Sequence, residues 1–199
     1  MIEGNDGGAT VTFNGGETWS TIYNQPTAEM YHVVTDTRFP YRIYGSQQDN
    51  TAIAVPSRAR IMGITEIEAY EIGGGESGYI AVRPDDPDIV YAGSHHGVLT
   101  RYDHRTRQAR SIEVWPETYG FGLENASARY RFHWTYPILI SPHDPNVLYV
   151  AANHVFRSTD EGVTWDVISP DLSRNERGKF DDHIGTERER CCTVFALAE

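Results

Sequence analysis

The chain has 199 residues, of which 39% are hydrophobic and 23% are charged, a composition typical of a folded globular protein rather than a disordered one. Its formal net charge of −11 disfavours nucleic acid as a partner, because phosphates would be repelled. No apolar run approaches the roughly 20 residues that a membrane-spanning helix needs, so we expect no membrane insertion. Residues 1–10 lack the pattern of a signal peptide, and the compartment stays open.

A turn motif of the form Ser/Thr-x-Asp-x-Gly-x-Thr-Trp occurs near each end of the chain. Residues 158–165 match every position, and residues 12–19 match with Asn in place of Asp. The Asp or Asn oxygen can accept hydrogen bonds from backbone N–H groups of the turn, the Gly can adopt a positive φ, and the Trp can pack between strands. We therefore interpret the motif, an Asp-box, as structural, through Thr12, Asn14, Gly16, Trp19, Ser158, Asp160, Gly162 and Trp165.

A second unit consists of an apolar strand, a turn rich in Pro and Asp, and another strand that carries a tyrosine. It occurs at 81–93 and 139–151, with a looser copy at 34–45. Its tyrosines, Tyr44, Tyr91 and Tyr149, are separated by 47 and 58 residues. A four-stranded propeller blade takes roughly 40–50 residues, so each copy predicts one blade.

Together the two units predict an all-β chain that folds as a single β-propeller over residues 1–199, with about four blades' worth of four-stranded antiparallel sheets. We expect a partial blade at 1–24, whole blades at 30–75, 78–116 and 132–170, an insertion at 117–131, a polar loop at 171–192 and a terminal strand at 193–199. The terminal strand is expected to complete the partial first blade. Self-association through open blade edges is the alternative, because unpaired edges recruit strands from other chains.

The two cysteines, Cys191 and Cys192, are adjacent in the sequence. A bridge between neighbouring cysteines is strained, so we expect two reduced thiols. Their spacing fits neither a disulfide framework nor a metal site. We predict no metal site and no cofactor.

Three segments carry a resemblance to a known family: 91–106 (YAGSHHGVLTRYDHRT), 130–149 (YRFHWTYPILISPHDPNVLY) and 156–175 (FRSTDEGVTWDVISPDLSRN). They resemble bacterial BNR or Asp-box repeat proteins, which are glycosyl-hydrolase-like and sortilin-like β-propellers, and the chain resembles an internal fragment of one. Proteins of this fold include sialidases, xyloglucan-cleaving endoglucanases, sortilin-type receptors and photosystem assembly factors, and relatives are often exported. Because these proteins share the fold and differ in activity, the resemblance implies no single function.

The leading hypothesis is an interaction scaffold that binds a glycan or a protein on the face that carries the loops. The alternative is a glycoside hydrolase, sialidase-like or xyloglucan-cleaving-like, that uses paired carboxylates on the propeller rim. A third hypothesis is that the segment only contributes blades to a longer protein. Whether the chain is an enzyme stays open.

Candidate ligand-binding residues occur where two of the expected blades present polar side chains at strand ends. Gln48, Asp49 and Asn50 can hydrogen-bond sugar hydroxyls, and Asp49 is the one candidate catalytic carboxylate. A simple polar turn is the alternative. His95 and His96 lie at the equivalent place in the next blade, where strand alternation would point them to opposite faces and away from a shared metal.

The segment 129–136 alternates basic and aromatic residues, and supplies the further ligand-binding candidates Arg129, Arg131 and Trp134. Arginine binds carboxylates and aromatic faces stack on sugars. The alternative is an incoming strand whose aromatics fill the gap between blades. In the later loop, 181–183 (Asp-Asp-His) fits either a cation contact or solvated side chains.

Overall fold

The computed structural model describes residues 1–5, 8–23, 28–59, 63–116, 129–174 and 192–199. This part of the chain consists almost wholly of antiparallel strands and turns, which confirms the all-β prediction. None of its helical segments is long and apolar enough to cross a membrane.

The strands form one hairpin and three four-stranded sheets, and within each of them strands that follow one another in sequence are paired. The N-terminal hairpin contains β1 (Ile2–Asn5) and β2 (Gly8–Val11). Sheet I contains β3 (Met30–Thr35), β4 (Arg42–Gln47), β5 (Ala52–Pro56) and β6 (Tyr70–Glu71). Sheet II contains β7 (Ile80–Val82), β8 (Ile89–Gly93), β9 (Leu99–Asp103) and β10 (Gln108–Ser111). Sheet III contains β11 (Ile138–Ile140), β12 (Leu148–Ala151), β13 (Val155–Ser158) and β14 (Asp166–Val167).

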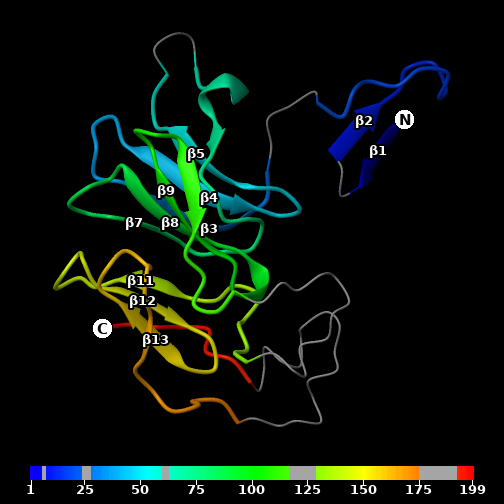
Figure 1. Cartoon of the computed structure of the whole chain (residues 1–199). Helices are drawn as coiled ribbons and strands as arrows, with labels where there is room; N and C mark the ends of the chain where they lie inside the picture. Colours follow the sequence, from blue (N-terminus) through cyan, green and yellow to red (C-terminus); the bar gives the residue numbers. More distant parts are fainter. Residues whose placement is uncertain (6–7, 24–27, 60–62, 117–128, 175–191) are drawn as a thin grey trace.

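Two short 3₁₀ turns accompany the strands, η1 (Glu66–Glu68) before β6 and η2 (His95–Gly97) between β8 and β9. The three sheets follow one another through space, while the N-terminal hairpin lies apart from them (Figure 1). The first strands of the sheets are neighbours, since β3 packs against β7 and β7 packs against β11.

The central strand β8 of sheet II is buried on both faces because sheet II lies between the other two sheets. All five residues of β8 are buried. Successive side chains of a strand point to opposite faces, so Val90 joins the core shared with sheet I while Ile89 and Tyr91 join the core shared with sheet III. The two cores are lined by Tyr44, Ile72, Ile80 and Tyr102 on one side of sheet II and by Leu99, Ile112, Tyr136, Leu148 and Phe156 on the other.

Hydrogen bonds between residues of the Pro/Asp repeat connect successive sheets. Arg38, in the turn between β3 and β4, donates to Asp88 Oδ1 of sheet II at 2.7 Å. Arg83, at the end of β7, donates to Asn146 Oδ1 of sheet III at 3.0 Å. Asp88 and Asn146 occupy the same position of the repeat. The repeat therefore supplies contacts between sheets as well as a turn within each sheet.

The described strands differ from the expected ones in three places. The segment 1–24, expected to hold the last three strands of a blade, has two strands in its described part. Beyond residues 12–19, Ser20 N–H donates to Val11 O at 2.9 Å, but the described residues there form no third strand. The last strand-rich segment begins at Ile138 instead of 132, because its ladder with β12 covers Ile138–Ile140, with Pro137 O accepting from Ala151 N–H at 3.4 Å just before it. The residues before it follow an irregular path.

The C-terminal segment also differs from its predicted role. Residues 193–199 form no strand and do not complete the hairpin. Val194 N–H donates to Ala152 O at 2.8 Å, and Tyr149 donates to Glu199 Oε1 at 3.2 Å, so the segment lies along sheet III. Figure 1 shows the C-terminus there, on the far side of the molecule from β1 and β2.

The prediction of reduced thiols is wrong for Cys192, which is buried and disulfide-bonded. Cys191, the insertion 117–128 and residues 181–183 lie outside the described residues.

Candidate functional site

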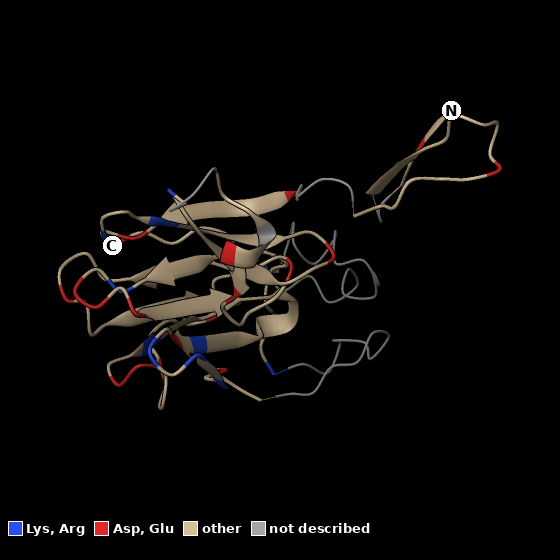
Figure 2. Cartoon of the chain, turned by 90° about the horizontal axis from the view of Figure 1, so that it is seen from above, with Lys and Arg blue, Asp and Glu red and all other residues tan. Residues whose placement is uncertain are grey.

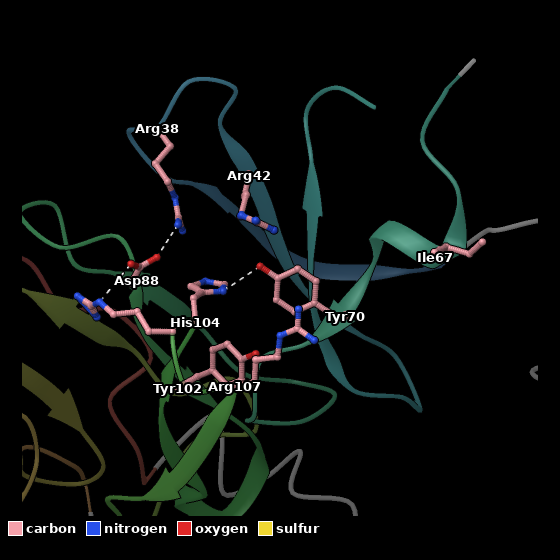
Figure 3. Close-up of a pocket in the computed structure, with 9 residues that line it drawn as sticks. Arg38, Arg42, Ile67, Tyr70, Asp88, Tyr102, His104 and Arg107 are labelled. Atoms are coloured by element: carbon pink, nitrogen blue, oxygen red, sulfur yellow. Dashed lines mark hydrogen bonds and ion pairs between the residues drawn. The ribbon is translucent and has the colours of Figure 1, made fainter. Parts of the chain in front are cut away.

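A pocket of about 450 Å³ lies where sheet I meets sheet II. It opens at the end of the sheets that carries the β3–β4, β7–β8 and β9–β10 turns. Residues from both sheets face it, as Figure 3 shows. Its lining consists of Arg38, Arg42, Ile67, Tyr70, Asp88, Tyr102, His104, Arg105 and Arg107.

The β9–β10 turn brings three of these residues to the pocket. Asp103 Oδ1 accepts a hydrogen bond from Arg105 N–H at 2.8 Å, and Arg107 N–H donates to Asp103 O at 2.8 Å. Arg107 itself has a φ of 56°, in the left-handed region. The turn thus places His104 beside sheet I, half-buried, and leaves Arg105 and Arg107 exposed at the pocket.

His104 is the centre of a chain of hydrogen bonds that crosses from sheet II to sheet I. Its Nδ1 lies 2.8 Å from Tyr70 Oη and its Nε2 lies 3.2 Å from Tyr44 Oη. Tyr44 in turn donates to Asp36 Oδ2 at 3.0 Å. A carboxylate only accepts hydrogen bonds, so this bond uses the single Tyr44 proton.

That constraint determines the tautomer of His104. Because Tyr44 has no second proton, His104 Nε2 must carry the hydrogen and donate to Tyr44 Oη. His104 Nδ1 is then an acceptor, and Tyr70 donates to it. The Tyr70 oxygen consequently offers the pocket only its lone pairs, beside the Arg42 guanidinium, which lies 5.1 Å from the centroid of the Tyr70 ring.

The electrostatic environment keeps His104, at the centre of these hydrogen bonds, neutral. Burial, together with the nearby charges of Arg38 and Arg42, lowers the pKa of His104 to about 4. Burial also raises the pKa of the Tyr70 phenol. Proton transfer from Tyr70 to His104 is therefore unfavourable, since it would charge both groups against these preferences. The network orients Tyr70 as a neutral phenol and does not make it a nucleophile.

The four arginines of the pocket fall into two pairs. Arg38 forms ion pairs with Asp36 at 2.6 Å and Asp88 at 2.7 Å. Arg105 pairs with Asp86, with Asp88 at 3.3 Å and with Asp103 at 3.4 Å. Within the described residues, Arg42 and Arg107 form no ion pair with a carboxylate. In a chain of net charge −11, these two cations face a concave site beside tyrosine rings.

Five of the candidates from the sequence meet at the opposite end of the sheets. Glu76, between β6 and β7, accepts hydrogen bonds from Gln48 Nε2 at 3.3 Å and from Asp49 N–H at 3.0 Å. Its other oxygen lies 3.5 Å from His95 Nδ1. The His95 ring stacks on Trp134 at 4.7 Å, and His96 meets Trp134 edge-on at 6.3 Å. Their side chains are largely engaged with one another.

The polar-turn interpretation fits the geometry at residues 48–50. Asp49 has a φ of 55°, and Asn50 N–H donates to Gln47 O at 3.1 Å, which closes the β4–β5 turn. The expectation that His95 and His96 point to opposite faces of a strand is wrong. They lie in η2, where His96 has a φ of 60°, and their rings touch with centroids 4.8 Å apart.

The alternating segment 129–136 does not behave as a strand with two faces. Arg131 forms an ion pair with Asp171 at 2.7 Å, and the Arg129 guanidinium lies 4.1 Å from the centroid of the Trp115 ring. Phe132 and Tyr136 pack together in the core between sheets II and III. The structure therefore assigns these aromatics to packing and separates Arg129 and Arg131 from the pocket.

Sequence reasoning missed Arg42, Tyr70, His104 and Arg107 as site residues. The one signal in the sequence was their position, since Arg42 follows the Pro-containing turn of the 34–45 repeat and His104 and Arg107 lie in the polar segment after the 81–93 repeat. No protein-family model matches the chain, and no curated protein is significantly similar to it.

Proposed function

We propose that the chain is part of an Asp-box β-propeller and serves as an interaction scaffold that binds an anionic glycan in the pocket between sheets I and II. The propeller proposal is supported by three successive four-stranded meanders whose first strands are neighbours. It is further supported by arginine contacts between successive sheets whose acceptors, Asp88 and Asn146, occupy the same position of the repeat. This arrangement is the one expected of consecutive blades around an axis.

The observation that carries the binding proposal is the pair of cations that no carboxylate neutralises, Arg42 and Arg107. Charge-assisted hydrogen bonds from arginine to an anion are among the stronger polar contacts. Tyr70 and Tyr102 add ring surface beside the cations, as carbohydrate ligands require. Of the described residues that line the pocket, Asp88 is the one carboxylate, and it is held by Arg38 and Arg105. The lining therefore favours binding over hydrolysis by a pair of carboxylates.

The proposal is tested by measuring binding of carboxylated, sulfated and phosphorylated oligosaccharides to the full chain at physiological salt. We expect at least one class to bind, and we expect Arg42→Gln and Arg107→Gln each to weaken that binding about tenfold, since one charge-assisted bond contributes about 1.5 kcal/mol. Arg157→Gln is the matched control, because Arg157 lies on sheet III and pairs with Asp166 at 3.5 Å. Binding that is absent for every class, or equal in all variants, would overturn the proposal.

A further inference from the structure

The charges around the pocket limit how much negative charge a ligand can bring. Two of the four arginines, Arg38 and Arg105, form ion pairs with four carboxylates, and the other two, within the described residues, form none. The four carboxylates are those of Asp36, Asp86, Asp88 and Asp103. With His104 neutral, four positive and four negative charges leave the region with no net formal charge. A ligand with one negative charge is therefore better matched than a dianion, which would add repulsion from the paired carboxylates and from a protein of charge −11.

The Tyr70 oxygen adds a second, chemically different requirement. Since its proton is donated to His104 Nδ1 at 2.8 Å, it can only accept a hydrogen bond from a ligand. A ligand that carries a hydroxyl can donate to this acceptor, whereas a ligand built only of an anion and a hydrocarbon ring cannot. The hydroxyl therefore adds a hydrogen bond that the second kind of ligand lacks.

We infer that the ligand group held in this pocket is a sugar monocarboxylate, a uronate, whose carboxylate binds Arg42 and Arg107 and whose hydroxyl donates to Tyr70 Oη. This inference rests on the proposed function and narrows it to one ligand class. His104 is a positioning residue, since it acts on the ligand only by holding the Tyr70 proton.

Four small probes separate these contributions when they are titrated into the full chain and followed by NMR. D-Glucuronate carries both features, its methyl ester lacks the charge, cyclohexanecarboxylate lacks the hydroxyls, and glucose 6-phosphate carries a dianion. We expect glucuronate to bind most tightly and each other probe to bind about tenfold more weakly. Glucose 6-phosphate that binds more tightly than glucuronate, with a loss in Arg42→Gln, would overturn the inference and leave the proposed function standing.

The Tyr70→Phe variant tests the acceptor directly, because it keeps the ring and removes the oxygen. We expect a loss of about tenfold in affinity for glucuronate and no change for cyclohexanecarboxylate. Tyr149→Phe, on sheet III, is the matched control and should change neither affinity. An equal loss for both probes would overturn the role of the oxygen. Should Tyr70→Phe fail to fold, the comparison of glucuronate with its methyl ester and with cyclohexanecarboxylate on the unaltered chain decides the same question. Insensitivity of every probe to Arg42→Gln and Arg107→Gln would overturn both proposals.

Discussion

The two copies of the turn motif, residues 12–19 after the N-terminal hairpin and residues 158–165 between β13 and β14 of sheet III, form corresponding hydrogen bonds. In the first, Thr12 Oγ1 donates to Asn14 Oδ1 at 2.9 Å and accepts from Gly16 N–H at 3.0 Å. In the second, Ser158 Oγ donates to Asp160 Oδ1 at 2.8 Å and accepts from Gly162 N–H at 2.9 Å. The local geometry follows from the motif in both places.

The surroundings of the two turns differ. The turn at 158–165 packs against sheet II, where Trp165 Nε1–H donates to Ile112 O at 2.9 Å. Glu161 accepts there from Arg83 at 3.0 Å and from Arg101 at 2.7 Å. At 12–19 the position of Glu161 is taken by Gly15, and the Trp19 side chain is 42% exposed. Figures 1 and 2 both show the hairpin apart from the sheets. Figure 2 shows charged residues largely in the turns at the sheet ends.

The motif therefore closes a turn by itself but stabilises the fold only where it packs against a neighbouring sheet. The same eight-residue pattern gives the Trp of one turn a buried partner and leaves the Trp of the other partly in solvent. Paired substitutions at equivalent positions can therefore separate the local contribution of the motif from that of its neighbour.

The largest difference is expected at the tryptophans. Trp165→Ala should lower the free energy of unfolding by about 3 kcal/mol, because it removes packing between sheets II and III and leaves the Ile112 carbonyl without its donor. Trp19→Ala should cost less than about 1 kcal/mol, since that side chain is partly exposed. Urea unfolding followed by circular dichroism measures both, and equal losses would contradict the comparison.

Alanine substitutions at Gly162 and Gly16 should differ in their loss of stability by a smaller amount. Both have positive φ, 80° at Gly162 and 100° at Gly16, so Ala at either position costs about 1 kcal/mol of backbone strain. At Gly162 an added Cβ would also lie 2.6 Å from Ile112 Cδ1, whereas at Gly16 the nearest atom is Met1 Cε at 3.4 Å. We expect Gly162→Ala to cost about 2 kcal/mol in total and to lower the melting temperature more than Gly16→Ala does. The reverse order would show that Ile112 moves to accommodate the added methyl group.

The glutamate at the second turn should have a more modest effect. Glu161→Gln weakens the ion pairs to Arg83 and Arg101 and should cost about 1 kcal/mol, reduced by partial solvent exposure of the carboxylate. Glu17→Gln, in the first turn, is the control and should be neutral. Thermal unfolding at low and high salt checks both variants, and a Glu161→Gln effect that does not shrink in high salt would argue against an electrostatic origin.

The smallest expected difference is in pH dependence. Hydrogen bonds from Thr164 and Ser158 lower the pKa of Asp160 from an ordinary value of 3.8 to about 2. Because the pKa is depressed in the folded chain, this stabilisation is present above pH 3.8 and is lost as the pH falls toward 2. In Asp160→Asn, which reproduces the side chain of the first turn, that part of the acid dependence should disappear. Hydrogen exchange of the turn amides between pH 5 and pH 2 measures it, and identical profiles for the two chains would refute the assignment.

Much of the strand pattern was predictable because its determinants are local. Pro, Asp and Gly set turns through their own backbone preferences, and strands that are separated by short turns pair with each other. Residues 129–136 show where local reasoning fails. They alternate like a strand, yet the ladder with β12 covers Ile138–Ile140 and is preceded by a bond to Pro137 O, so Phe132 and Tyr136 pack in a core instead.

The all-β character, the turns at 12–19 and 158–165 and the Pro/Asp repeat follow from residues close together in the sequence. The place of the candidate site follows from the packing of one sheet on another. Arg42 and Tyr70 come from sheet I, and His104 and Arg107 come from sheet II. These residues share a pocket because the faces of two sheets pack together, and no spacing along the chain encodes which turn will meet which. The tautomer of His104 also depends on tertiary structure, because it is determined by Tyr44 and Asp36, which belong to the neighbouring sheet and its turn.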